Sequence, residues 1–197
     1  GADPDYNASV VDAIVQAVEI AADSVKPVHL RVGSVRMRDR SEWFSGRHFG
    51  GKNPTDKTHG LITDIRDPVI VSDQVFALRA VDADGQGVAT LVNWAGHPEV
   101  TGDEHNQISS DYVHTLRSRL ETKLGGRALY FPEVLGGMQS ALGGHVPMVD
   151  DAGEWQRQPN GDPVMSKALG FEFARAVGVH VADAGIAALN DGEDMVL

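Results

Sequence analysis

His97 stands directly after a run of apolar residues and is the most informative position for chemistry in the sequence. The run covers residues 88–95 and predicts a central strand that is buried on both faces. In open sheets, ligands collect where strands end and the chain leaves the core. A neutral imidazole at such a place can bind Zn²⁺, which activates water near neutral pH. The plainer interpretation of a single histidine is an imidazole hydrogen-bonded to a nearby carbonyl, because a zinc site normally uses three protein ligands.

A second candidate site lies in the glycine-rich segment after the next predicted strand. Gly136 and Gly137 precede Gln139 and Ser140 there. Glycines let backbone N–H groups approach a substrate, and a serine beside them can act as a nucleophile or as a hydrogen-bond donor to an oxyanion. The spacing is not the G-x-S-x-G of a nucleophile elbow, and an ordinary glycine-rich turn is the alternative.

Further polar side chains follow His97 in the sequence. Asp111 and His105 are candidates for groups that orient a metal ligand by hydrogen bonding. The alternatives are a helix N-cap for Asp111 and a solvated acidic loop around His105. His180 falls on the apolar face of a predicted helix, where we expect a part-buried structural histidine.

The candidate residues are positioned by alternating helices and strands. Apolar residues at helical spacing predict three helices, over 8–24, over 110–124 and after 162–163. Apolar runs and alternation predict strands over 28–37, 75–81, 88–94 and 128–134. The Asp84-Gly85 pair predicts a hairpin turn between the second and third of these strands. The order predicts a mixed α/β (α+β) fold, with a mixed sheet and a β-hairpin flanked by helices.

A long segment with few regular patterns, residues 39–60, is predicted to form an ordered flap. It carries Trp43, Phe44 and Phe49 among arginines, glycines and acidic residues. Irregular segments of this length inside a domain are usually functional or disordered, and the aromatic residues favour the first.

Composition limits the class of protein. The chain has 197 residues, 42% of them hydrophobic, and 17 basic against 28 acidic residues give a net charge of −11. This acidic balance argues against nucleic acid or an anionic membrane surface as a partner. Cysteine is absent, which excludes disulfides, thiolate metal sites and a cysteine nucleophile. No apolar run approaches the roughly 20 residues of a membrane-spanning helix.

The length predicts that residues 1–197 form one domain or part of a catalytic domain. The chain begins at Gly1 without an initiating methionine, so we expect a processed, cloned or clipped form.

Taken together, four segments resemble the neutral/alkaline (non-lysosomal) ceramidase family, including its bacterial homologues. They are VKPVHLRVGS at 25–34, NWAGHP at 93–98, ISSDY at 108–112 and GMQS at 137–140. The second is similar to the family's strand end Asn-Phe/Trp-Ala-x-His, and the fourth to its Gly-Asp-x-Ser-Pro loop. Their order and gaps agree with the family over most of the chain.

The resemblance implies a zinc-dependent amidase that hydrolyses the N-acyl bond of a ceramide-like lipid through a zinc-activated water. By resemblance, His97 is a zinc ligand and Ser140 is the active-site serine, with a positioning or polarising role. Family members are often secreted or periplasmic, so the resemblance implies such a location, and it also implies a role in sphingolipid metabolism.

The sequence departs from the family pattern near the serine, where Met138 and Ala141 replace the family's Asp and Pro. The family's other zinc ligands lie in motifs upstream and downstream of this chain. We therefore expect missing segments or a partner chain to complete the zinc site. Two other functions remain open: a non-catalytic binding or assembly module with a degraded metal site, and a serine hydrolase that uses Ser140 with His97 or His145.

Overall fold

The fold is a mixed sheet with two helices packed on one face. The computed structural model describes residues 3–37, 58–59, 62–63, 72–102, 107–133, 141, 146–166 and 169–195. The main sheet has five strands in the order β6-β5-β4-β1-β9. Their bounds are β1 His29–Arg36, β4 Gln74–Val81, β5 Gly87–Trp94, β6 Arg127–Pro132 and β9 Glu193–Asp194. This architecture confirms the predicted mixed α/β fold.

The hairpin of β4 and β5 forms the middle of the sheet, as the turn signal predicts. Asp82 closes the turn, because its carboxylate Oδ1 accepts hydrogen bonds from the backbone N–H groups of Asp84 and Gln86. β5 pairs with β4 in antiparallel and with β6 in parallel orientation. Parallel strands run in the same direction, so β5 and β6 end at the same edge of the sheet, where Trp94 pairs with Pro132.

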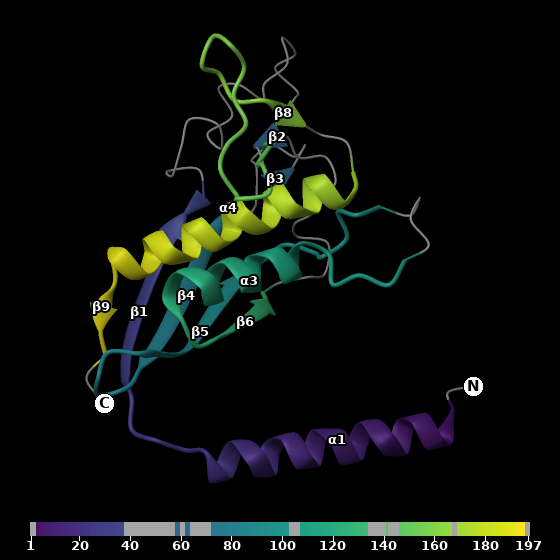
Figure 1. The fold of residues 1–197 in the computed structure, drawn as a ribbon, viewed down its shortest axis with the longest axis vertical. Coiled ribbons are helices and arrows are strands. Elements are labelled where there is room, and N and C mark those ends of the chain that lie inside the picture. The colour runs from purple at the N-terminus through teal and green to yellow at the C-terminus, as the bar shows by residue number, and fades with distance from the viewer. Residues whose placement is uncertain are drawn as a thin grey trace.

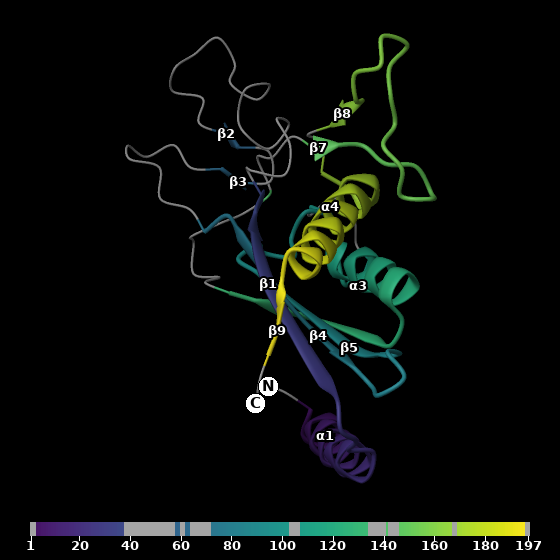
Figure 2. The ribbon, with the colours of Figure 1, turned by 90° about the vertical axis from the view of Figure 1, so that its left-hand side faces the viewer.

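Two helices, α3 (Tyr112–Leu124) and α4 (Phe171–Asn190), lie side by side on one face of the sheet (Figures 1 and 2). Leu116 and Leu120 of α3 are fully buried, as their spacing predicts. α4 crosses β1 closely, since a β-carbon added to Gly33 would lie 1.9 Å from the carbonyl oxygen of Ala188. The core is therefore the layer between these helices and the sheet.

The opposite face of the sheet is only partly buried. In β5 the residues that face the helices, Thr90, Val92 and Trp94, are buried, whereas those between them are half-buried. Farther along this face Leu129 and Phe131 of β6 are 46% and 51% exposed. β5 thus pairs with a strand on each side, as a central strand does. The expectation that both of its faces are buried is wrong, because the helices cover only one face of the sheet.

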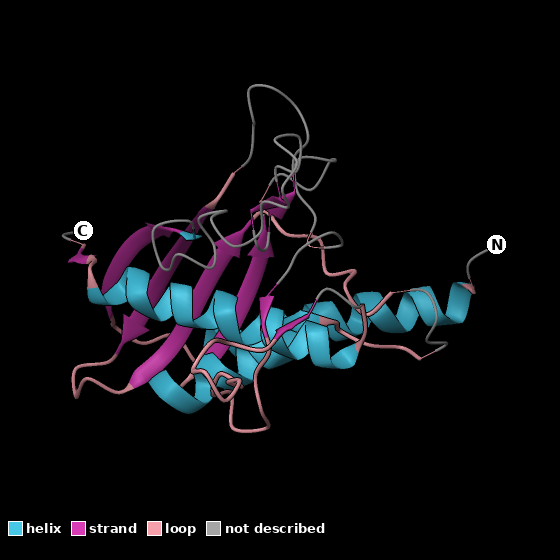
Figure 3. Cartoon of the chain, turned by 90° about the horizontal axis from the view of Figure 1, so that it is seen from above, coloured by secondary structure: helices cyan, strands magenta, loops and turns pink. Residues whose placement is uncertain are grey.

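The first helix, α1 (Pro4–Asp23), lies apart from the sheet, beyond the His29 end of β1 (Figures 1 and 2). Seen from above, its N-terminal end extends past the sheet and the other helices (Figure 3). Asp3 caps it by accepting hydrogen bonds from the N–H groups of Asp5 and Tyr6. None of its residues is buried, although its apolar side chains follow helical spacing. The predicted helix is confirmed, and it starts four residues earlier than expected because Asp3 is its N-cap.

The third helix starts later than its sequence signal suggests. Asp162 and Pro163 lie in a turn, where Gln158 N–H donates to the Asp162 carbonyl, and α4 begins only after Gly170. The segment before α4 forms the short strands β7 (Val146–Pro147) and β8 (Met165–Ser166). A further short pair, β2 (Thr58–His59) and β3 (Ile62–Thr63), lies within residues 58–63.

Among the described helices, none combines the length and the apolarity that a membrane crossing requires.

Candidate functional site

His97 lies in the turn that leaves β5, at the edge of the sheet where β5 and β6 both end. Its side chain is half-buried, whereas the two residues before it, Ala95 and Gly96, are buried. The placement at a strand end is the one that the sequence predicts. We call residues 95–102 the His97 turn.

The close packing of the backbone on the Trp94 indole explains why residue 96, just after β5, is a glycine. A β-carbon added to Gly96 would lie 2.2 Å from the indole atom Cζ3 of Trp94. Real β-carbons do not approach another atom so closely, so a larger residue would push the turn away from the indole. The indole is itself fully buried and meets the Tyr112 ring edge-on at 5.8 Å.

Two tyrosine hydroxyls bind the backbone immediately before His97. Tyr112 Oη donates to the Gly96 carbonyl at 2.6 Å, and Tyr130 Oη donates to the Trp94 carbonyl at 2.7 Å. Burial, followed by the neighbouring Tyr130 hydroxyl, raises the pKa of Tyr112 above its usual range. Burial also raises the pKa of Tyr130 to about 12. Both phenols therefore remain protonated donors at neutral pH.

Asp111 holds the far end of the His97 turn. Its carboxylate accepts hydrogen bonds from Thr101 N–H at 2.7 Å and from Tyr112 N–H at 2.8 Å. It is the N-cap of α3, with a φ of 55°, a conformation that L residues rarely adopt. Asp111 and His97 thus belong to one hydrogen-bonded region, and the predicted N-cap is confirmed.

Glu133 is the last described residue before the segment with the other predicted site residues, and it lies at the same edge of the sheet. Glu133, the residue after β6, donates its backbone N–H to the Trp94 carbonyl at 3.2 Å. Gly136, Gly137, Gln139, Ser140 and His105 lie outside the described residues, as do Trp43, Phe44 and Phe49. Their roles remain predictions.

Sequence reasoning missed Tyr112 and Tyr130 as parts of this region. A buried tyrosine hydroxyl usually has a hydrogen-bond partner, and Tyr130 sits at an inward-facing position of a predicted strand. That signal indicates that a partner exists, but it does not identify the carbonyls before His97.

Within the described ranges, no three His, Asp or Glu side chains gather into a group that could hold a metal ion. His180, in contrast to His97, is buried, and its Nε2 lies 2.7 Å from the Pro147 carbonyl. This contact confirms that it is a structural histidine.

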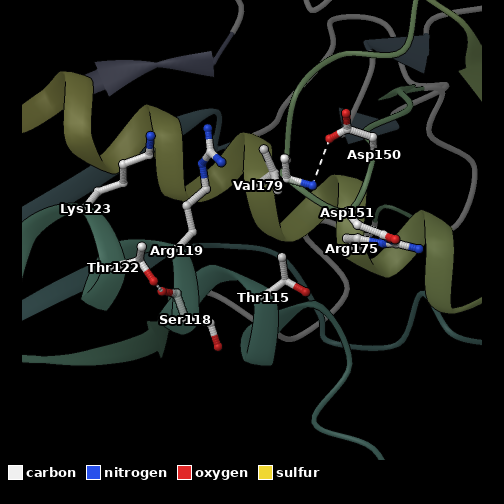
Figure 4. Close-up of a pocket in the computed structure, with 11 residues that line it drawn as sticks. Thr115, Ser118, Arg119, Thr122, Lys123, Asp150, Asp151, Arg175 and Val179 are labelled. Carbon is white, nitrogen blue, oxygen red and sulfur yellow. Dashed lines mark hydrogen bonds and ion pairs between the residues drawn. The ribbon is translucent and has the colours of Figure 1, made fainter.

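A pocket of about 340 Å³ lies between α3, α4 and the turn at 150–153 (Figure 4). Its guanidinium groups are engaged by carboxylates: Arg119 forms a two-point ion pair with Asp183, and Arg175 pairs with Asp151. None of the predicted site residues lines it, so it is separate from the His97 turn.

Searches against sequence models of protein families and against curated proteins found no match. Solved structures do show a likeness. The neutral ceramidase from Pseudomonas aeruginosa superposes with a TM-score of 0.57 and 21% identity, over 92% of this chain and 26% of that chain. A structure of ceramidase complexed with C2 gives a TM-score of 0.53 and 18% identity, over 84% of this chain and 23% of that chain.

At these identities the likeness concerns the fold. The chain spans about a quarter of the length of both ceramidases. It therefore shares the fold of a part of neutral ceramidase, in agreement with the resemblance that its sequence motifs predict.

Proposed function

We propose that this chain is part of a zinc-dependent amidohydrolase that cleaves a linear amide, such as the N-acyl bond of a ceramide-like lipid. The fold shared with part of neutral ceramidase supports the proposal. The observation that carries it is the position of His97, a half-buried imidazole on a hydrogen-bonded turn at the edge where β5 and β6 end.

The side chains of this chain that could bind a metal are of the types that bind zinc. Cysteine is absent, so a metal must take imidazole nitrogen or carboxylate and phenol oxygen, and zinc accepts the first two of these readily. We propose that His97 supplies one ligand and that, as the family resemblance implies, the remaining ligands lie outside this chain.

A zinc ion held by His97 and the other ligands would supply a water with a pKa near 7, a nucleophile at neutral pH. The protein must then stabilise the amide oxygen as it gains negative charge. We assign this role to the Ser140 hydroxyl and to the backbone N–H groups of Gly136 and Gly137, with Gln139 as a further substrate contact. The flap with Trp43, Phe44 and Phe49 would cover the acyl chain.

The test is the zinc content and affinity of the full-length protein with His97→Ala. Loss of one of the protein ligands should lower zinc affinity by at least tenfold and abolish hydrolysis of an N-acyl amphiphile. His114→Ala is the matched control, because His114 is an exposed histidine on α3 and its loss should leave both quantities unchanged.

Equal zinc content in the wild type and His97→Ala would contradict the ligand assignment. A protein that retains zinc but shows no amidase or esterase activity with metal supplied would instead support the binding-module function. Labelling of Ser140 by a serine-directed covalent probe would favour the serine-hydrolase alternative.

A further inference from the structure

Four oxygen atoms meet directly behind the His97 turn. They are the hydroxyls of Tyr112 and Tyr130 and the carbonyls of Trp94 and Gly96. The two hydroxyls lie 2.8 Å apart, and Tyr130 Oη also lies 2.9 Å from the Gly96 carbonyl. The tyrosines come from different elements, α3 and β6, so this cluster joins the helix layer to the sheet at the point where β5 ends.

The protons in this cluster can be counted. Each phenol carries one proton, so two protons serve two carbonyls and the contact between the hydroxyls. The Trp94 carbonyl also accepts a backbone hydrogen bond from Glu133 at 3.2 Å. The hydrogen bonds found for the Gly96 carbonyl among the described residues come from the two tyrosines alone, and the shorter of them is that of Tyr112.

The Gly96 carbonyl and the backbone nitrogen of His97 belong to one planar peptide unit. A hydrogen bond that fixes the carbonyl therefore fixes the plane from which the His97 α-carbon and side chain depart. The indole of Trp94 packs closely against the same segment, since it leaves no room for a β-carbon at residue 96.

The other end of the turn is held by the same helix. Asp111, the neighbour of Tyr112, accepts from Thr101 N–H, and the Val100 carbonyl accepts from Gly170 N–H at the start of α4 at 3.0 Å. The turn is thus held at both ends by hydrogen bonds to its backbone, and His97 lies between the two ends.

We propose that Tyr112 and Tyr130 are positioning residues for His97, and that their hydroxyls orient its imidazole for metal binding through the peptide unit of Gly96. This inference rests on the proposed function in one respect, the role of His97 as a zinc ligand. Tyr112 is the main contributor, because the Gly96 carbonyl depends on it most directly.

The experiment compares Tyr112→Phe, Tyr130→Phe and the double variant in the full-length protein, with Tyr6→Phe as the control. Each phenylalanine keeps the ring and removes the hydroxyl alone. Tyr6 lies on α1 and is 66% exposed. Zinc affinity is measured by competition with a chelator. The imidazole NMR signals of His97 are measured in the zinc-free protein and assigned by their absence in His97→Ala.

Tyr112→Phe should lower zinc affinity by about 10- to 100-fold, the range found for groups that orient metal ligands. It should also shift the imidazole signals of His97, while those of His114 and His180 stay in place and report an intact fold. Tyr130→Phe should have a smaller effect, and Tyr6→Phe none. A purely structural role would lower thermal stability without moving the His97 signals.

Wild-type zinc affinity in Tyr112→Phe, together with zinc loss in His97→Ala, would overturn the positioning role. If His97→Ala keeps its zinc, the proposed function fails. The positioning role is then tested by the NMR signals of His97 in zinc-free Tyr112→Phe alone. Unchanged His97 signals in Tyr112→Phe then reject it, and shifted signals support it.

Discussion

His97 and His180 lie in two different environments in the same chain. His97 is half-buried on a turn at the sheet edge, whereas His180 is buried beneath the segment at 146–166. The ring of Trp155 meets the His180 ring edge-on at 5.6 Å. The first environment leaves the imidazole partly exposed at the sheet edge, and the second places the ring in the core.

Burial makes His180 a determinant of stability at acidic pH. Desolvation lowers its pKa to about 4, although the Pro147 carbonyl and Asp183 oppose the shift and Arg119 adds to it. The unfolded chain takes up this proton near pH 6.5, its ordinary value. The contribution is therefore complete above about pH 6.5 and is lost as the pH falls toward 4.

We expect the free energy of unfolding of the wild type to fall by about 2 kcal/mol more than that of His180→Gln between pH 7 and pH 5. Glutamine can donate to the Pro147 carbonyl but does not titrate. Urea unfolding at several pH values measures the difference. Parallel pH dependences of the two proteins would show that His180 does not remain neutral in the folded state.

Among the elements, the start of α3 has the most direct connection to the candidate site. Its N-cap Asp111 accepts two backbone hydrogen bonds while its own backbone is strained at a φ of 55°. Strain of this kind costs about 1–3 kcal/mol and is kept where neighbouring interactions compensate for it. Here the compensation is the hydrogen bond from Thr101, which ties α3 to the His97 turn.

Asp111→Ala and Asp111→Gly separate the loss of the carboxylate's hydrogen bonds from the strain of the backbone. Both remove the carboxylate, so both should lower the free energy of unfolding, with alanine costing about 2 kcal/mol or more. Glycine should be about 1 kcal/mol more stable than alanine, because it adopts the positive φ without a β-carbon. Chemical denaturation measures both variants, and equal stabilities of the two would show that the strain at this position is negligible.

In the molecule as a whole, apolar burial is unevenly distributed. The core lies between the sheet and the pair α3 and α4, and Leu116 is fully buried there. α1 carries an apolar stripe of similar composition, yet Ile14 at its centre is 59% exposed. The far face of the sheet likewise exposes Leu129 and Phe131. The stability of the chain therefore comes mainly from one side of the sheet.

Leu116→Ala should lower the free energy of unfolding of this chain by about 2–5 kcal/mol, because it leaves a cavity in the core. Ile14→Ala removes a side chain of similar size from an exposed helix. It should change the free energy of unfolding by less than about 0.5 kcal/mol. Urea unfolding compares the two. A loss at Ile14 as large as that at Leu116 would mean that the stripe of α1 is covered in solution.

The sequence by itself determined the local elements and the position of His97 at a strand end. Apolar periodicity predicted α1, α3 and the strands, and Asp84-Gly85 predicted the hairpin, because these signals act between residues close together in the chain. The start of α4 was predicted incorrectly: Asp162-Pro163 has the pattern of a helix start, but the backbone of Asp162 is used in a turn instead.

Only the tertiary structure decided which face of the sheet is covered, that α1 lies outside the core and that Tyr112 and Tyr130 meet behind His97. These outcomes depend on contacts between segments far apart in the sequence. The carbonyl of Gly96 and the hydroxyl of Tyr130 are 34 residues apart. A sequence pattern can indicate that a buried hydroxyl needs a partner, but the partner is chosen by strand order and helix packing.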